Sequence, residues 1–248
     1  MKRAKQTSES IELGILLALS GGFMDAYSYL ARGQVFANAQ TGNMLLFGVN
    51  LASGQFQHAL HYLCPVLAFG LGIFLAEFVH FQKIQKVHWR QVTLLIEIII
   101  LFGVGYISYK SGVLVLFVKA TLKTVLTSPT CAAYIPGFVL NSLTSFACGL
   151  QVQAFRKIHG KGYATTMCIG NLRTGTHEMC NYLCTKKVQH LQSGLLYYLI
   201  ILTFIIGAIL GNFCIRIFSA KAIWISVSLL ILAFILMFVD REKDEAFQ

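Results

Sequence analysis

The chain has 248 residues, of which 56% are hydrophobic and only 12% are charged, and its mean hydropathy is +0.67. An ordinary soluble domain carries about 25% charged residues, so this chain has too little charge to cover a soluble globule. The composition excludes a disordered chain, a collagen-like fibre and a coiled coil, and it disfavours a soluble enzyme. It predicts an all-α, polytopic transmembrane helix bundle.

The net charge of +10 does not indicate nucleic-acid binding, because Lys and Arg lie mostly in short gaps between apolar stretches. That distribution is how membrane proteins mark their cytoplasmic side. The seven cysteines lie mostly inside apolar stretches, and the close pair Cys180 and Cys184 lacks a second pair that would complete a zinc site. We therefore expect the lipid bilayer as partner, no nucleic acid, no metal and no cofactor.

A membrane span requires about 20 predominantly apolar residues. Six stretches satisfy this requirement: 12–31, 59–81, 92–109, 131–155, 194–218 and 222–240. The first continues through Gly21, Gly22 and Asp25 without a small-residue cleavage site, so we expect a retained transmembrane helix and not a signal peptide.

Three further apolar stretches are interrupted by polar residues. The stretch 35–52 contains several amide side chains, and the stretch 163–184 contains threonines, an asparagine and charged residues. In the third, 112–127, Lys119 and Lys123 lie four residues apart and share one helical face, which predicts an interfacial helix.

The two halves of the chain resemble one another at a constant offset of 128 residues. This offset aligns the following pairs: Gly21 with Gly149, Ala26 with Ala154, Gly42 with Gly170, Asn43 with Asn171, and Asp25 with Gln153. After an insertion of seven residues, Gly72 and Ala76 correspond to Gly207 and Gly211. We predict one integral membrane domain over 1–248, with repeat 1 at about 10–110, a connector at about 111–130 and repeat 2 at about 131–240.

The positive charges test how the two polar segments cross the membrane. If both segments enter and leave on the same side, 13 basic residues lie inside: Lys2, Arg3, Lys5, Lys83, Lys86, Arg90, Arg156, Lys157, Lys161, Lys186, Lys187, Arg241 and Lys243. Six lie outside: Arg32, Lys110, Lys119, Lys123, Arg216 and Lys221. If both segments span fully, the split becomes 10 to 9. The positive-inside rule favours six crossings with re-entrant polar segments and both termini cytoplasmic. Three crossings per repeat make the repeats inverted, which is a recurring plan of secondary transporters.

Asp25 is the acidic residue placed deepest in an apolar stretch. A charged residue at the centre of a membrane helix costs about 2.5–3.5 kcal/mol on insertion scales, so it must face the protein interior or a wet cavity. The functional hypothesis is a proton or cation coupling site. The structural alternative is a hydrogen bond to a neighbouring helix.

The polar segments supply the other candidate ligands. A short helix that starts near Thr41 would direct free N–H groups toward the membrane interior, with Thr41 as its cap. The candidate solute- or ion-binding residues are Asp25, Asn38, Thr41, Gly42, Asn43, Gln151, Thr165, Thr166, Gly170 and Asn171. The alternative is that both segments are ordinary polar helices that pack against their neighbours.

The remaining charged residues in apolar stretches favour structural uses. Glu77 and Glu97 lie near helix ends and are expected to reach the interface or to pair with nearby basic residues. Arg173, His177 and Glu178 share one side of a helix, where an internal ion pair is favoured over a gate.

At these residues the chain resembles a known family. The segments GGFMDAYSYL, GQVFANAQTGNMLLFGVNLASG, ACGLQVQAF and YATTMCIGNL are similar to the YoaK family (domain of unknown function 1275), which comprises bacterial multi-pass membrane proteins. The resemblance covers essentially the whole chain and implies a bacterial inner-membrane protein, without a substrate. Val152 and Ile169 depart from the Asn and Thr that the family usually has, which disfavours ligand contacts at these two positions.

We therefore expect a small-solute or ion transporter or permease, not an enzyme, and the sequence allows a homo-oligomer. No nucleophile–base pair or metal-ligand set is visible in the sequence. The alternative function is a non-transport membrane protein with a structural, assembly or sensory role. A wet cavity that joins the polar residues would favour transport, and a dry, fully paired network would favour the alternative.

Overall fold

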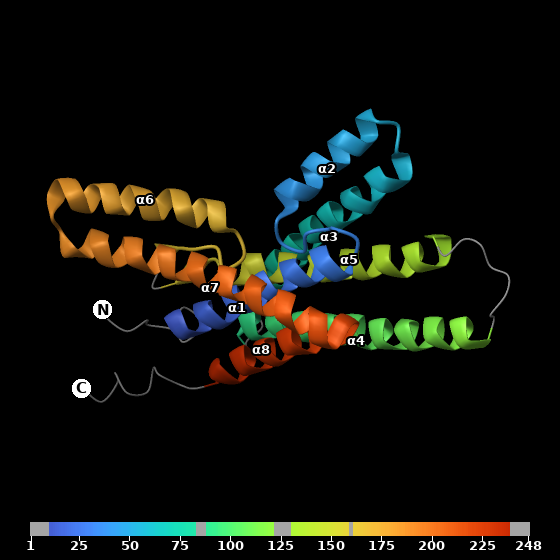
Figure 1. Cartoon of the computed structure of the whole chain (residues 1–248). Helices are drawn as coiled ribbons and strands as arrows, with labels where there is room; N and C mark the ends of the chain where they lie inside the picture. Colours follow the sequence, from blue (N-terminus) through green and yellow to red (C-terminus); the bar gives the residue numbers. More distant parts are fainter. Residues whose placement is uncertain (1–9, 83–87, 122–129, 159–160, 239–248) are drawn as a thin grey trace.

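The computed structural model describes residues 10–82, 88–121, 130–158 and 161–238 (Figure 1). The helices are α1 (Ile11–Ala31), α2 (Gln40–Ala52), α3 (Phe56–Phe81), α4 (Trp89–Thr121), α5 (Thr130–Ala154), α6 (Cys168–Thr185), α7 (Val188–Phe218) and α8 (Ile223–Leu236). A two-residue hairpin, β1 (Lys157–Ile158) and β2 (Lys161–Gly162), follows α5, and a short 3-10 helix, η2 (Ser219–Ala222), precedes α8.

Four of these helical segments are long and apolar enough to cross a membrane: Ile11–Ala31, Phe56–Phe81, Trp89–Ser108 and Val188–Phe218. Helices α5 and α8 occupy the other two expected stretches; α5 has 25 residues and α8 has 14. The structure confirms the predicted polytopic helix bundle.

The two halves of the fold repeat the same packing. Helix α1 packs against α7 as α5 packs against α3, α2 packs against α3 as α6 packs against α7, and α4 packs against α5 as α8 packs against α1. The first helices of the two halves run in opposite directions. The Asn141 amide early in α5 donates to the Arg32 carbonyl just after α1, at 2.7 Å. The Gln151 amide late in α5 donates to the Leu17 carbonyl early in α1, at 3.2 Å. The repeats are therefore inverted.

Glycines allow the closest helix crossings. A Cβ on Gly72 of α3 would lie 2.1 Å from the Phe146 carbonyl oxygen of α5, and a Cβ on Gly149 would lie 2.2 Å from the Phe69 carbonyl oxygen. In the other repeat, a Cβ on Gly207 of α7 would lie 2.1 Å from the carbonyl oxygen of Leu19 in α1. The aligned residues Gly72 and Gly207 thus occupy equivalent crossings, as small residues do between close-packed membrane helices.

The chain between α1 and α2 turns back into the bundle. Residue Asn38 lies beside α1, where its backbone N–H donates to Asp25 and its side chain donates to the Gly21 carbonyl. Helix α2 then leads away from the centre toward the turn that begins α3 (Figure 1). The carbonyl of Gly33, at the entry of this segment, is 3.2 Å from His61 Nε2 near the start of α3. Residues 32–52 therefore enter and leave at the same end of the bundle.

The chain between α5 and α6 does the same from the opposite end. Residues 163–167 return to α1, where a Cβ on Gly21 would lie 2.9 Å from Thr166 Cγ2. Helix α6 then runs outward beside α7 (Figure 1). Both re-entrant segments, defined here as 32–52 and 155–185, thus reach the same turn of α1.

The expectation of a separate interfacial helix over 112–127 was wrong. Helix α4 continues to Thr121 without a break, because neither Ser111 nor Gly112 ends it; residues 122–129 lie outside the described part of the chain.

Candidate functional site

One asparagine in each repeat holds its re-entrant segment together. The Asn43 side chain accepts from the Phe36 N–H at 3.0 Å and donates to the Phe36 carbonyl at 2.8 Å. The Asn171 side chain makes the same two bonds to Ala164, at 3.1 and 2.6 Å. Both asparagines are buried and bind the residue seven positions earlier. The 128-residue offset therefore describes a real structural equivalence, and these two amides stabilise loops.

Asp25 supplies the negative charge at the start of α2. Its side chain is 8% exposed and faces the protein core, as predicted. The Asp25 Oδ1 atom accepts from the Asn38 N–H at 2.6 Å, and the N–H groups of Ala37 and Ala39 also contribute to this site. A carboxylate here compensates the positive end of α2. Cys168, at the start of α6, lies within electrostatic range of the same carboxylate. Asp25 is thus close to the beginnings of both re-entrant helices.

Three buried side chains at this junction each present an oxygen without a hydrogen-bond partner among the described residues. They are Asn38 Oδ1, Gln151 Oε1 and Thr166 Oγ1. The amide orientations are fixed, because Asn38 Nδ2 donates to the Gly21 carbonyl at 3.1 Å and Gln151 Nε2 donates to the Leu17 carbonyl. Gln151 Nε2 also lies 3.5 Å from Thr165 Oγ1, so Gln151 links α5, α1 and the second segment. The exposed fractions of Asn38, Gln151 and Thr166 are 1%, 0% and 2%. Leaving such oxygens unpaired is costly, which makes them candidates for ligand contact.

The other predicted site residues lie differently. Thr41 is exposed and lies inside α2; the cap position is Ala39, which makes no side-chain cap, so the predicted Thr41 cap was wrong. Gly42 lies under the Phe36 ring, 2.8 Å from where a Cβ would stand. Gly170 is exposed, with nothing within 4 Å of such a Cβ. The junction thus consists of the loops before α2 and α6, not of the Gly-Asn pairs.

Glu97 was missed as a core residue. The interface or a basic partner was expected for it, but Glu97 is 0% exposed and neither carboxylate oxygen has a hydrogen-bond partner in the described part of the chain. The signal in the sequence was its context: it follows Thr93-Leu94-Leu95-Ile96 and precedes an apolar run. Glu77 pairs with Gln153 and with His80, at 3.5 Å to the latter.

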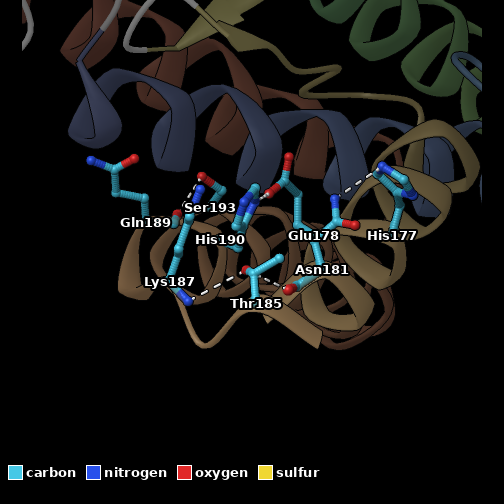
Figure 2. Close-up of polar contacts among 8 residues, drawn as sticks. All are labelled: His177, Glu178, Asn181, Thr185, Lys187, Gln189, His190 and Ser193. Atoms are coloured by element: carbon cyan, nitrogen blue, oxygen red, sulfur yellow. Dashed lines mark hydrogen bonds and ion pairs between the residues drawn. The ribbon is translucent and has the colours of Figure 1, made fainter. Parts of the chain in front are cut away.

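The predicted grouping of Arg173, His177 and Glu178 was also wrong. Figure 2 shows Glu178 of α6 directed toward His190 of α7, at 2.7 Å, whereas His177 bonds to Asn181 at 3.1 Å. Arg173 and His177 are exposed on the opposite face of α6, where they line an open hollow of about 670 Å³. Five residues separate Arg173 from Glu178, which is enough to turn the acid toward α7.

The described residues contain no group of three His, Cys, Asp or Glu side chains that could hold a metal ion. The charged and polar groups of the junction are instead arranged around α1. Oxygen atoms from the loop before α2, from α5 and from the loop before α6 are the groups available to a ligand.

Comparison with known proteins agrees with this architecture. A family model described as "Protein of unknown function (DUF1275)" matches residues 13–236, and the chain belongs to this family. The UPF0700 transmembrane protein YoaK of Bacillus subtilis (strain 168) is 24% identical over 220 residues, which are 87% of this chain and 88% of that protein. No solved structure matches. The chain is thus a membrane protein of this family, and the resemblance seen in its sequence is confirmed.

Proposed function

We propose that the protein is a transporter or permease for a small solute or an ion, and that it binds its substrate where the two re-entrant segments meet α1. The single observation that carries this proposal is the set of unpartnered buried oxygens on Asn38, Gln151 and Thr166. Inverted repeats whose broken helices meet near the membrane midplane are a recurring plan of secondary transporters.

The available groups favour one kind of substrate. Helix N-termini attract anions, but Asp25 already accepts the Asn38 N–H at the beginning of α2. The amide oxygens of Asn38 and Gln151 can only accept hydrogen bonds or coordinate a cation. The favoured substrate is therefore a cation or a small solute that donates N–H or O–H groups.

Thr166→Val provides the sharpest test. The hydroxyl of Thr166 has no partner in the described structure, so its replacement by a methyl group of similar size leaves folding intact. Thr203→Val is the matched control, because the Thr203 hydroxyl is also buried but bonds to the Leu199 carbonyl of its own helix.

The variants are reconstituted in liposomes and examined by solid-supported-membrane electrophysiology with ammonium, methylammonium, sodium, potassium and basic amino acids. We expect a solute-evoked current in the native protein and a half-saturation concentration raised about 3- to 10-fold in Thr166→Val, equivalent to one lost hydrogen bond. Thr203→Val should behave as native. Equal currents in Thr166→Val and the native protein would remove this residue from the site, and the absence of any solute-evoked current would favour the structural or sensory alternative.

A further inference from the structure

We propose that Glu97 binds a proton inside the membrane and is the group that exchanges protons with solvent in this protein. The role of that proton in coupling rests on the transport function proposed above, whereas its binding at Glu97 does not. The inference begins from a carboxyl group that neither the predicted site nor the family assigns.

The position of Glu97 in α4 places it in the core. Leu94 and Leu101 are completely buried on the same helix, and Thr93, one turn earlier, is 0% exposed. This face of α4 packs against α5 and α8. Glu97 lies about 12 Å along the helix from Trp89, at 1.5 Å per residue. It is therefore well inside the apolar part of the bundle and cannot reach the interface.

The groups around Glu97 offer no compensating charge. The α8 sequence IWISVSLLILAFIL contains no titratable residue, and η2 carries only Lys221 at the far end of α4. Helix α5 contributes Cys148, which is within electrostatic range of Glu97 and of Asp25. Arg90 lies on α4 itself, two turns away. The titratable groups of α3 are His58, His61, Tyr62, Cys64, Glu77 and His80; Glu77 and His80 pair with each other.

A proton fits this environment better than a metal ion does. Calcium takes six to eight oxygen ligands, and other hard cations likewise require several. The Glu97 oxygens have no hydrogen-bonding neighbour among the residues that the structure describes, so no coordination shell is present. A proton needs only one carboxyl oxygen, and it removes the charge that would otherwise be costly at this depth.

Asp25 and Glu97 therefore have different roles. The Asp25 carboxylate accepts backbone N–H groups at the start of α2, which favours its charged form. Glu97 has no such donors, and Cys148 lies within electrostatic range of both acids. A proton at Glu97 is thus positioned to respond to a cation that arrives near Asp25, because two neighbouring negative charges repel each other in the low-dielectric core.

Infrared spectroscopy of the full-length protein in lipid tests proton binding directly. We expect a band from a protonated carboxyl group that disappears in Glu97→Gln, persists in Asp25→Asn, and shifts after transfer to D₂O, which would show exchange with solvent. If the Gln variant fails to fold, Glu97→Asp keeps an acid and should shift the band. A native spectrum without such a band, a band unchanged in both Glu97 variants, or a band that never shifts in D₂O would overturn the proposal.

Coupling is measured separately, in liposomes that contain the pH-sensitive dye pyranine. Ammonium-free buffers and the solutes of the electrophysiology panel are used as probes. We expect solute addition to move protons in the native protein, with at least a 10-fold smaller proton flux in Glu97→Gln. Solute transport without proton movement would overturn the coupling role. Absence of all solute transport would reject the transport proposal, while the infrared result would still decide proton binding.

Discussion

The two re-entrant segments share a scaffold and differ in charge. In both, an asparagine amide binds the N–H and the carbonyl of the residue seven positions earlier. Only the first has a carboxylate at its helix start, from Asp25. The residue aligned with Asp25 is Gln153, and Gln153 donates to Glu77 of α3 instead. What the repeats share is therefore architecture, and what they do not share points to function.

The helix crossings should respond equally in the two repeats, and most strongly. Gly72→Ala and Gly207→Ala each place a methyl carbon about 2.1 Å from a backbone oxygen, so each should lower the free energy of unfolding by about 3 kcal/mol. Gly70→Ala is the control, because nothing lies within 4 Å of its Cβ position. Thermal unfolding in detergent measures all three. A loss confined to one of the two crossings would break the equivalence of the repeats.

The asparagine locks come next in size. Asn43→Ala should cost about 2–3 kcal/mol, because it leaves the Phe36 N–H and carbonyl unpaired and also removes the bond to Gln40 at 2.8 Å. Asn171→Ala loses only the two bonds to Ala164 and should cost less. Asn50→Ala, whose amide bonds within its own helix, should change stability by less than about 0.5 kcal/mol. Unfolding curves that rank Asn50 with Asn43 would refute the lock.

Asp25 and Gln153 should differ although they align. Asp25→Leu removes the acceptor at the start of α2 and should lower stability by about 2 kcal/mol, since hydrogen bonds to charged groups are stronger than neutral ones. Gln153→Leu removes a partly exposed contact with Glu77 and should cost about 0.5 kcal/mol or less. The same detergent unfolding assay applies, and equal losses would mean that the charge has no special role.

The smallest effect is expected at the outer end of the second hairpin. Glu178→Gln weakens the contact with His190, whose side chain is 31% exposed, and should cost about 0–1 kcal/mol. That loss should shrink further in high salt. A cost above about 2 kcal/mol would show that α6 depends on this pair more than α2 depends on any charge.

The sequence predicts the architecture well, because apolar length and the 128-residue offset depend on local patterns. Asn43 and Asn171 are recognisable in this way. The junction is harder to predict, because Asn38, Gln151 and Thr166 meet only after chain reversal brings α5 and both loops to α1. Glu97 shows a different limit: basic residues nearby in the sequence suggested partners, but helix rotation directs its carboxyl group into the core. The Thr41 cap failed for a similar reason, because α2 begins at Gln40 beside a carboxylate from another helix.

The central claim is that each polar segment enters and leaves at one end of the bundle. Single cysteines at Ala31, Ser53, Arg156 and Lys187, all exposed positions, test it in a variant without the seven native cysteines. A membrane-impermeant maleimide is applied to one side of oriented vesicles at a time. We predict that Ala31 and Ser53 react from one side, and that Arg156 and Lys187 react from the other. Reaction of Ala31 and Ser53 from opposite sides would mean that residues 32–52 cross the membrane, which would contradict the inverted, re-entrant architecture.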